Sequence, residues 1–132
     1  MLKFIHRVSN NKGVIEVVVE TLMNKVLEEG REFTYVYKLL KSDFLMEVDG
    51  NQRNVQAYGI EIETQGVVNG NIEKIYSDCE KYISPQRHKV KTLLKLLSDN
   101  TVSPIHFIDI AGEYIDEYIS DFDEEFKGIA SC

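Results

Sequence analysis

Apolar side chains recur at spacings of three and four residues in the last third of the chain. One run follows Ser84-Pro85 and consists of Val90, Leu93, Leu94 and Leu97. A second run follows Ser103-Pro104 and consists of Ile105, Ile108, Ala111/Gly112, Ile115 and Ile119. This spacing places each run along one face of a helix. Serine can cap a first-turn amide, and proline at the first helical position loses no internal hydrogen bond. The sequence therefore predicts two C-terminal helices joined by a short connector, residues 98–102.

Upstream of these helices the pattern favours strands. Residues 14–27 contain the β-branched run Val17-Val18-Val19, which is typical of a strand. The same segment also fits a helical stripe, so a helix over 14–27 remains an alternative. Residues 1–8 form a candidate short strand that could lead through the turn-rich segment 9–13 into Val14.

Three turn signals predict how the later strands pair. A three-residue loop at Glu28-Glu29-Gly30 would place Met23 beside Tyr35. Two-residue turns at Asp49-Gly50 and Asn69-Gly70 would set Leu39 opposite Ile60 and Ile60 opposite Cys79. On these registers Glu61 faces Asp78, and the strand over 33–48 must break near residues 41–43. The expected helix-facing residues are Val19, Met23, Phe33, Tyr35, Tyr37, Leu39, Ile60, Ile62, Ile75 and Cys79.

The predicted fold is α+β. It consists of an antiparallel β-meander of about four strands, followed by two C-terminal helices packed on one face. The opposite face of the first two strands would then present an uncovered apolar patch, formed by Val14, Val18, Leu22, Val26, Val36 and Leu40. Contiguous apolar patches of more than about a few hundred Å² are unusual on monomers. We therefore expect a homodimer that buries this patch on both subunits.

Length and composition predict one cytoplasmic domain spanning residues 1–132. The chain is 43% hydrophobic, and no apolar run approaches the roughly 20 residues that cross a bilayer. The first residues, interrupted by Lys3, His6 and Arg7, do not resemble a secretory signal. Two cysteines are too few for a disulfide framework, which favours a reducing compartment.

The net charge of -7 comes entirely from the end of the chain. Residues 101–132 hold eight acidic residues and only Lys127, giving 1 - 8 = -7, so residues 1–100 are neutral. Within this region, residues 122–132 are expected to form a frayed acidic tail.

The basic segment 81–95 is a candidate nucleic-acid surface. It carries Lys81, Arg87, Lys89, Lys91, Lys95 and His88, and no acidic residue follows Glu80 until Asp99. Basic side chains along a helix can follow a phosphate backbone. If the two helices formed a helix-turn-helix, the second helix would be the one that contacts the nucleic acid. That helix carries Asp109, Glu113, Asp116 and Glu117, which a phosphate backbone would repel. The simpler interpretation is that the basic segment complements the acidic helix. Nucleic-acid binding is retained as an alternative function.

His106, Asp109 and Glu113 are the best candidates for metal or catalytic chemistry. They stand at i, i+3 and i+7 of one predicted helix, but a structural metal site needs about four ligands. Cys79 lies between Asp78 and Glu80, without a cation to activate its thiol. We therefore predict no catalytic, cofactor-binding or metal-binding residue, and a centre at His106 remains the alternative.

Two motifs support a family resemblance. Tyr58-Gly59-Ile60-Glu61-Ile62, and Val102-Ser103-Pro104-Ile105-His106 with Asp109, resemble a family of short uncharacterised Firmicutes proteins that is classified as a domain of unknown function. The resemblance covers roughly residues 33–119 and implies a bacterial cytoplasmic protein, but no activity or ligand. The function that we expect from the sequence is a non-enzymatic protein-interaction or regulatory domain.

Overall fold

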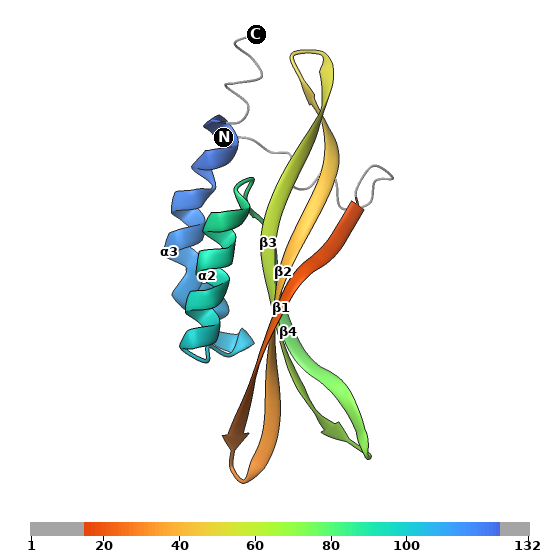
Figure 1. Ribbon diagram of the computed structural model, residues 1–132, viewed down its shortest axis with the longest axis vertical. Helices are drawn as coiled ribbons and strands as arrows, with labels where there is room; N and C mark the ends of the chain where they lie inside the picture. Colours follow the sequence, from red (N-terminus) through yellow and green to blue (C-terminus); the bar gives the residue numbers. More distant parts are fainter. Residues whose placement is uncertain (1–14, 125–132) are drawn as a thin grey trace.

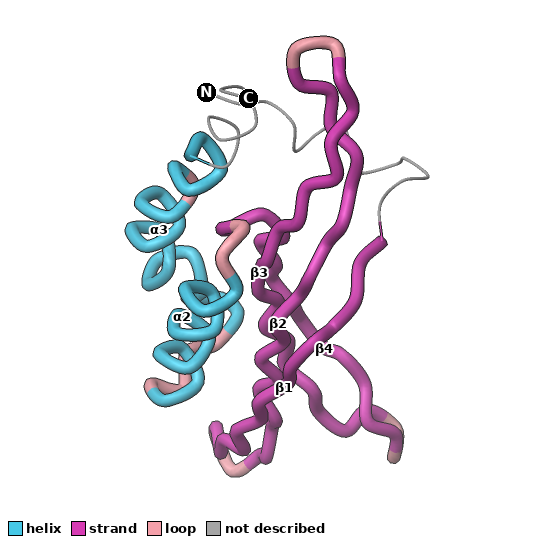
Figure 2. Tube along the Cα trace, turned by 45° about the horizontal axis from the view of Figure 1, so that its top comes forward, coloured by secondary structure: helices cyan, strands magenta, loops and turns pink. Residues whose placement is uncertain are grey.

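In the computed structural model, residues 15–124 are described here as structure, and residues 1–14 and 125–132 lie outside the described part. One antiparallel sheet has the strand order β1-β2-β3-β4, with β1 at Ile15–Glu28, β2 at Arg31–Val48, β3 at Asn51–Val68 and β4 at Asn71–Ser84. The helix α2 (Arg87–Asp99), the 3₁₀ turn η1 (Pro104–His106) and the helix α3 (Phe107–Tyr118) follow. The helices cover one face of the sheet (Figures 1 and 2). The predicted α+β meander with C-terminal helices is confirmed, as is the strand over the described part of 14–27. The candidate strand at residues 1–8 lies outside the described residues.

All three hairpins have two-residue turns in the left-handed conformation. The φ angles are 50° and 77° at Glu29-Gly30, 51° and 79° at Asp49-Gly50, and 52° and 83° at Asn69-Gly70. Positive φ at both positions is the type I′ pattern, whose twist matches that of the flanking strands. The prediction was right for the last two turns. It was wrong for the first, where Glu28 pairs with Arg31 and no three-residue loop forms.

The shorter first turn shifts the register of β1 by one residue. Tyr35 lies opposite Asn24 rather than Met23, and Tyr37 lies opposite Leu22. Because side chains alternate between the two faces of a sheet, a shift of one residue moves the β1 side chains between Glu20 and Glu28 to the other face. Met23 is therefore exposed, whereas Leu22 and Val26 pack against the helix-side core. A register irregularity at Val18/Glu20 lets Val19 contact the same core.

The β2–β3 register is confirmed, with Leu39 opposite Ile60 and no break in β2 near residues 41–43. The β3–β4 register follows the prediction from the turn to Gln65 and then shifts by one residue. Ile60 consequently faces Glu80, and Glu61 faces Cys79 rather than Asp78. The extra residue in β4 is Ile75, so the expected clash of two carboxylates is avoided by a bulge.

The core between sheet and helices contains Tyr37, Leu39, Ile60 and Ile62 from the sheet, together with the four predicted α2 residues Val90, Leu93, Leu94 and Leu97. In α3 the predicted stripe is right at Ala111 and Ile115, which pack in the core, and wrong at its start, where Ile105 and Ile108 are 69% and 47% exposed. Phe107 is buried in their place, so the observed stripe runs through Phe107, Ala111, Ile115 and Tyr118. This stripe also has helical spacing, and its aromatic side chains bury more apolar surface.

Ser-Pro sequences precede both helices, but neither serine side chain caps as expected. Ser103 is the N-cap residue of η1, yet its side chain makes no capping hydrogen bond; its carbonyl accepts the His106 amide at 3.1 Å. The helix α2 begins at Arg87, with Gln86 as N-cap. Ser84 Oγ accepts the Gln86 amide at 3.0 Å and donates to Asp121 at 2.8 Å, so it joins the end of β4 to the region after α3.

The sheet is strongly coiled, which brings its two edge strands together. Lys81 Nζ on β4 lies 3.1 Å from Glu16 Oε2 on β1, although these strands stand at opposite ends of the strand order. Val36 and Leu40, on the face away from the helices, are 2% and 3% exposed. The coiling helps to explain why this face is not the open surface that a flat sheet would present.

The six residues of the predicted apolar patch do not share one open face. Leu22 and Val26 pack on the helix side, Val36 and Leu40 are buried, and only Val18 is exposed; Val14 lies outside the described residues. The physical reason is the register shift in β1 together with the coiling of the sheet. Dimerisation itself stays a prediction. Similarly, Phe122 is buried where a frayed tail was expected to start, and residues 125–132 of that tail are outside the described part.

Candidate functional site

A cleft of about 590 Å³ lies where the sheet extends beyond the two helices. Figure 1 shows the β1–β2 and β3–β4 hairpins diverging below the α2–α3 connector. The strands contribute Phe33, Tyr35, Thr64, Ile75 and Tyr76, and the opposing wall consists of residues 100–106 together with Ile110. Ile75, Tyr76, Ile105 and Ile110 are 45% to 69% exposed. Bulky apolar side chains are therefore open to solvent around one concave surface.

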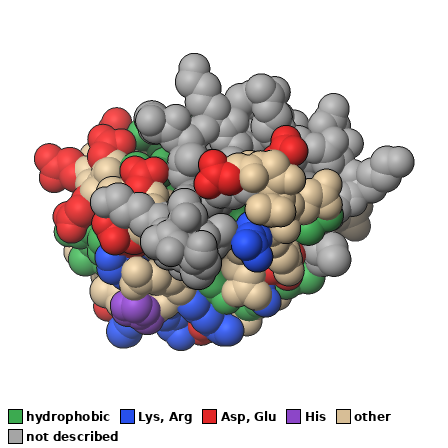
Figure 3. Space-filling view, turned by 90° about the horizontal axis from the view of Figure 1, so that it is seen from above, with side chains coloured by type: hydrophobic (Ala, Val, Ile, Leu, Met, Phe, Trp, Pro, Cys, Tyr) green, Lys and Arg blue, Asp and Glu red, His purple; other side chains and the backbone are tan. Residues whose placement is uncertain are grey.

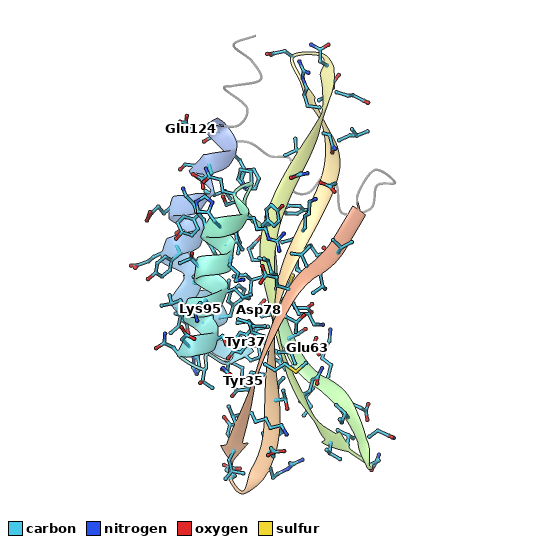
Figure 4. All side chains as sticks on the ribbon, viewed as in Figure 1. Tyr35, Tyr37, Glu63, Asp78, Lys95 and Glu124 are labelled. Carbon is cyan, nitrogen blue, oxygen red and sulfur yellow. The ribbon has the colours of Figure 1, made fainter. Side chains whose placement is uncertain are left out.

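Hydrogen bonds from the sheet fix the connector that forms the wall. Tyr37 Oη donates to the Val102 carbonyl at 2.9 Å, and Asn24 Nδ2 donates to the Ser98 carbonyl at 2.6 Å. Thr101 has a φ of 51°, and the next amide, that of Val102, bonds the Leu97 carbonyl at 3.0 Å. Burial raises the pKa of Tyr37 to about 12, so its hydroxyl stays protonated and able to donate. Figure 4 shows Tyr37 on the side of the sheet that faces the helices.

A glycine lets two lining side chains meet across the floor. A Cβ at Gly66 would lie 2.5 Å from Ile75 Cδ1 and 3.1 Å from Phe33 Cδ1. Phe33 is covered from another side by Arg31, whose guanidinium carbon lies 5.5 Å from the ring centroid. The absence of a side chain at Gly66 thus allows β2 and β4 to share an apolar surface across β3.

The charge of the cleft is negative. Among the described residues that line it, Glu28 is the carboxylate, and none is Lys or Arg. Glu28 Oε1 accepts a hydrogen bond from Tyr35 Oη at 3.3 Å. Burial, with the charge of Glu28, raises the pKa of Tyr35, which therefore remains a neutral donor. The cleft combines an apolar surface with one acidic group, which suits binding rather than bond-making chemistry.

The structure brings only two of the three metal candidates together. His106 Nδ1 lies 3.7 Å from Asp109 Oδ2, and their side chains are 66% and 79% exposed. Within residues 15–124, no group of three or more His, Cys, Asp or Glu side chains is arranged to hold a metal ion. His106 instead lines the apolar cleft through its position in η1.

Cys79 is a free, half-buried thiol on β4. Burial, followed by the charge of Glu61, raises its pKa to about 11. A thiol of that pKa is almost entirely protonated at neutral pH and is a poor nucleophile.

Each Lys and Arg of the basic segment 81–95 forms an ion pair with a carboxylate. Lys81 pairs with Glu16, Lys89 pairs with Asp121 at 2.9 Å, and Lys95 pairs with Asp99. Arg87 and Lys91 both pair with Glu20 on β1. The expected pairing with Asp109, Glu113, Asp116 and Glu117 is not found among the described residues. Lys89 instead pairs with Asp121, which follows α3, and Arg87 and Lys91 complement the sheet.

Sequence reasoning missed the cleft because its residues come from five separated segments. Phe33 and Ile75 were assigned to the helix-covered face, and Ile105 to the core. One sequence signal could have indicated the cleft: the strands are longer than the helices. A strand rises about 3.3 Å per residue against about 1.5 Å in a helix, so strands of 14 to 18 residues must extend beyond helices of 12 or 13.

Comparison with known sequences places the chain in a family. The profile of the Family of unknown function (DUF6514) matches residues 16–117, which include the sheet except the first residue of β1 and α3 except its last residue. The chain belongs to DUF6514. This assignment confirms the predicted membership in a family of unknown function; DUF6514 carries no activity to transfer. No curated protein and no solved structure matches. Among the described residues, no helix is long and apolar enough to cross a membrane.

Proposed function

We propose that this protein is a non-enzymatic, cytoplasmic interaction domain that binds an apolar segment of another protein in the cleft. The observation that carries the proposal is the exposure of four large apolar side chains, Ile75, Tyr76, Ile105 and Ile110, around one concave surface of about 590 Å³. Exposed apolar surface gathered in a groove is typical of protein-binding sites. Aromatic and aliphatic side chains in such a groove act as anchors for a partner.

The rigidity of the wall supports the same function. The connector is held by a buried hydrogen bond from Tyr37 and a partly buried one from Asn24, so a partner would meet a surface that is already formed. A pre-formed surface costs less conformational entropy to bind than a loop that must first become ordered.

Affinity capture from the native host tests the proposal with a matched pair of variants. Ile105→Lys places a charge in the cleft, whereas Ile108→Lys places it on an exposed α3 position that does not line the cleft. The proposal predicts a co-purifying protein that the wild type and Ile108→Lys retain and that Ile105→Lys loses. Equal retention by both variants, with both folded, would contradict it.

Self-association is a second part of the proposal, supported by a different surface. With the observed register, Val18, Met23 and Leu27 of the edge strand β1 lie on the side away from the helices and are 50%, 64% and 74% exposed. Light scattering distinguishes a dimer of about 30 kDa from the 15.2 kDa chain. Met23→Lys should restore the monomer mass; 15.2 kDa for the wild type at every concentration would contradict self-association.

A further inference from the structure

We propose that the segment bound in the cleft is cationic: a stretch of a protein partner in which Lys or Arg stands beside bulky apolar side chains, with the cation paired to Glu28. This inference rests on the proposed function, because it names the chemistry of the partner for the same site. Its basis is the charge of the cleft and of the surface that continues from it.

The carboxylate of Glu28 can accept a hydrogen bond from a ligand in the cleft. One of its oxygens accepts the Tyr35 hydroxyl at 3.3 Å, and no Lys or Arg in residues 15–124 lies within ion-pair distance of its carboxylate. The nearby cation Arg31 stacks over the Phe33 ring. An apolar occupant without a charge would cover Glu28 and reduce its hydration without compensation. An occupant with a Lys or Arg at this point supplies the missing partner.

The surface beyond the cleft is acidic on the α3 side. Ile110 lines the cleft, and Asp121, three helical turns later, accepts a hydrogen bond from Ser84 at the end of β4. The flank of α3 that borders β4 therefore also carries Tyr114 and Glu117, at spacings of four and seven from Ile110. Glu113 lies beside this flank. A partner segment that leaves the cleft along α3 would meet carboxylates.

The side of the cleft that the strands form is also negatively charged. Asp78 is two residues beyond Tyr76 on β4, and both residues pair with even-numbered residues of β3 on the helix side, Ile62 and Thr64. Among the described residues, no Lys or Arg is within ion-pair distance of Asp78, Glu113 or Glu117. Figure 3, which looks from the end opposite the cleft, shows carboxylates gathered at the left, over α3, and Lys and Arg along the lower edge. An anionic segment would be repelled from both sides of the cleft.

Labelled synthetic peptides test the inference on the full chain by fluorescence anisotropy. Three peptides of equal length are used: one alternating leucine and lysine, one alternating leucine and glutamate, and one alternating serine and lysine. Two variants remove one negative charge each. Glu28→Gln does so in the cleft, and Glu32→Gln does so four residues away on β2, where Glu32 pairs with Leu27 on the opposite face.

The expected result is binding of the leucine/lysine peptide alone. Glu28→Gln should weaken that binding by about 3- to 10-fold, and Glu32→Gln should leave it unchanged. Glu28→Lys should gain binding of the leucine/glutamate peptide. Equal weakening by Glu28→Gln and Glu32→Gln would mean that only the net charge matters, and tight binding of the serine/lysine peptide would mean that the apolar lining is not used; either result overturns the inference.

Failure of the inference can be told apart from failure of the proposed function. If the leucine/glutamate peptide binds the wild type as well as the leucine/lysine peptide, and Ile105→Lys abolishes both, the cleft binds apolar segments and the cationic specificity is wrong. If no peptide binds and affinity capture gives equal retention by Ile105→Lys and Ile108→Lys, the proposed function fails, and with it the inference.

Discussion

The hydroxyl of Tyr37, at the centre of the sheet, donates a 2.9 Å hydrogen bond to the carbonyl oxygen of Val102 in the α2–α3 connector. The two residues are 65 positions apart in sequence, and both are buried. Val102 lines the cleft, so the bond ties the wall of the proposed binding site to the most buried part of the fold. The shape of the cleft is therefore set by the core.

Tyr37→Phe should destabilise the protein by about 1–3 kcal/mol, because the buried Val102 carbonyl loses its donor. Urea unfolding measures this change. Tyr114→Phe is the control: its ring is 38% exposed, and it should change the free energy of unfolding by less than about 0.5 kcal/mol. Similar effects of the two substitutions would argue against the buried hydrogen bond.

Lys38→Met should cost about 1–3 kcal/mol at neutral pH, because it removes the closer cation of the buried Glu63 carboxylate, 2.7 Å away, and leaves only Lys74 at 3.8 Å. Burial alone would raise the pKa of Glu63, but hydrogen bonds from Lys38 and Gln65 lower it below the usual value. Figure 4 shows Glu63 on the side of the sheet away from the helices. A lowered folded-state pKa adds stability that is present above the unfolded-state pKa and is lost as the pH falls through the folded-state pKa.

The difference between wild type and Lys38→Met should therefore shrink in acid, as measured by urea unfolding at several pH values. Lys25→Met, which removes an exposed lysine on β1, is the control and should show neither effect. A constant difference down to low pH would contradict the role of Glu63.

Gly59→Ala should destabilise far more than Gly66→Ala. A Cβ at Gly59 would lie 2.3 Å from the Glu80 carbonyl oxygen and 2.4 Å from the backbone of Lys81, which cannot move without disrupting β4. At Gly66 the closest atom is Ile75 Cδ1, the end of a flexible side chain. We expect about 3 kcal/mol or more for Gly59→Ala and about 1 kcal/mol for Gly66→Ala by thermal or urea unfolding. The reverse order would contradict the close approach of β3 and β4 at Gly59.

Glu80→Gln should stabilise the protein at neutral pH. Burial, and then the charge of Asp78, raise the pKa of Glu80, so ionising this carboxyl costs more in the folded protein than in the unfolded chain. Stability is lost as the pH rises from the unfolded-state pKa through the folded-state pKa, and glutamine removes that loss. The urea midpoint of Glu80→Gln should exceed that of wild type at pH 7 and approach it in acid. A lower midpoint at pH 7 would show that the carboxylate is stabilising.

Local signals in the sequence predicted much of the sheet. The Asp49-Gly50 signal predicted the turn between β2 and β3 correctly. Because this hairpin has no bulge, the turn also set every β2–β3 residue pair as far as Tyr35 and Thr64. The same reasoning failed at Glu29-Gly30, where Glu29 adopts a φ of 50° that is uncommon for glutamate. It failed again beyond Gln65, because the bulge at Ile75 lies inside the strand, where no turn signal marks it; there Ile75 lies over Gly66.

The two helices show how far hydrophobic periodicity alone predicts which residues are buried. The α2 stripe was correct because its other positions are mostly polar. In α3, the predicted and the observed stripe share Ala111 and Ile115 and differ in the first turn, where Phe107 is buried in place of Ile105 and Ile108. The cleft uses residues from both places where the prediction failed, Ile75 at the bulge and Ile105 at the start of the helical region. A site that depends on tertiary packing in this way is not encoded in any local sequence pattern.

Amide chemical-shift mapping of the ¹⁵N-labelled protein with the leucine/lysine peptide locates the binding site directly. We expect shifts at Glu28, Phe33, Ile75, Tyr76 and residues 100–110, with the β2–β3 hairpin near Asp49-Gly50 unchanged as an internal control. Shifts confined to the basic segment 81–95, or spread evenly over the acidic surface, would contradict a binding site in the cleft.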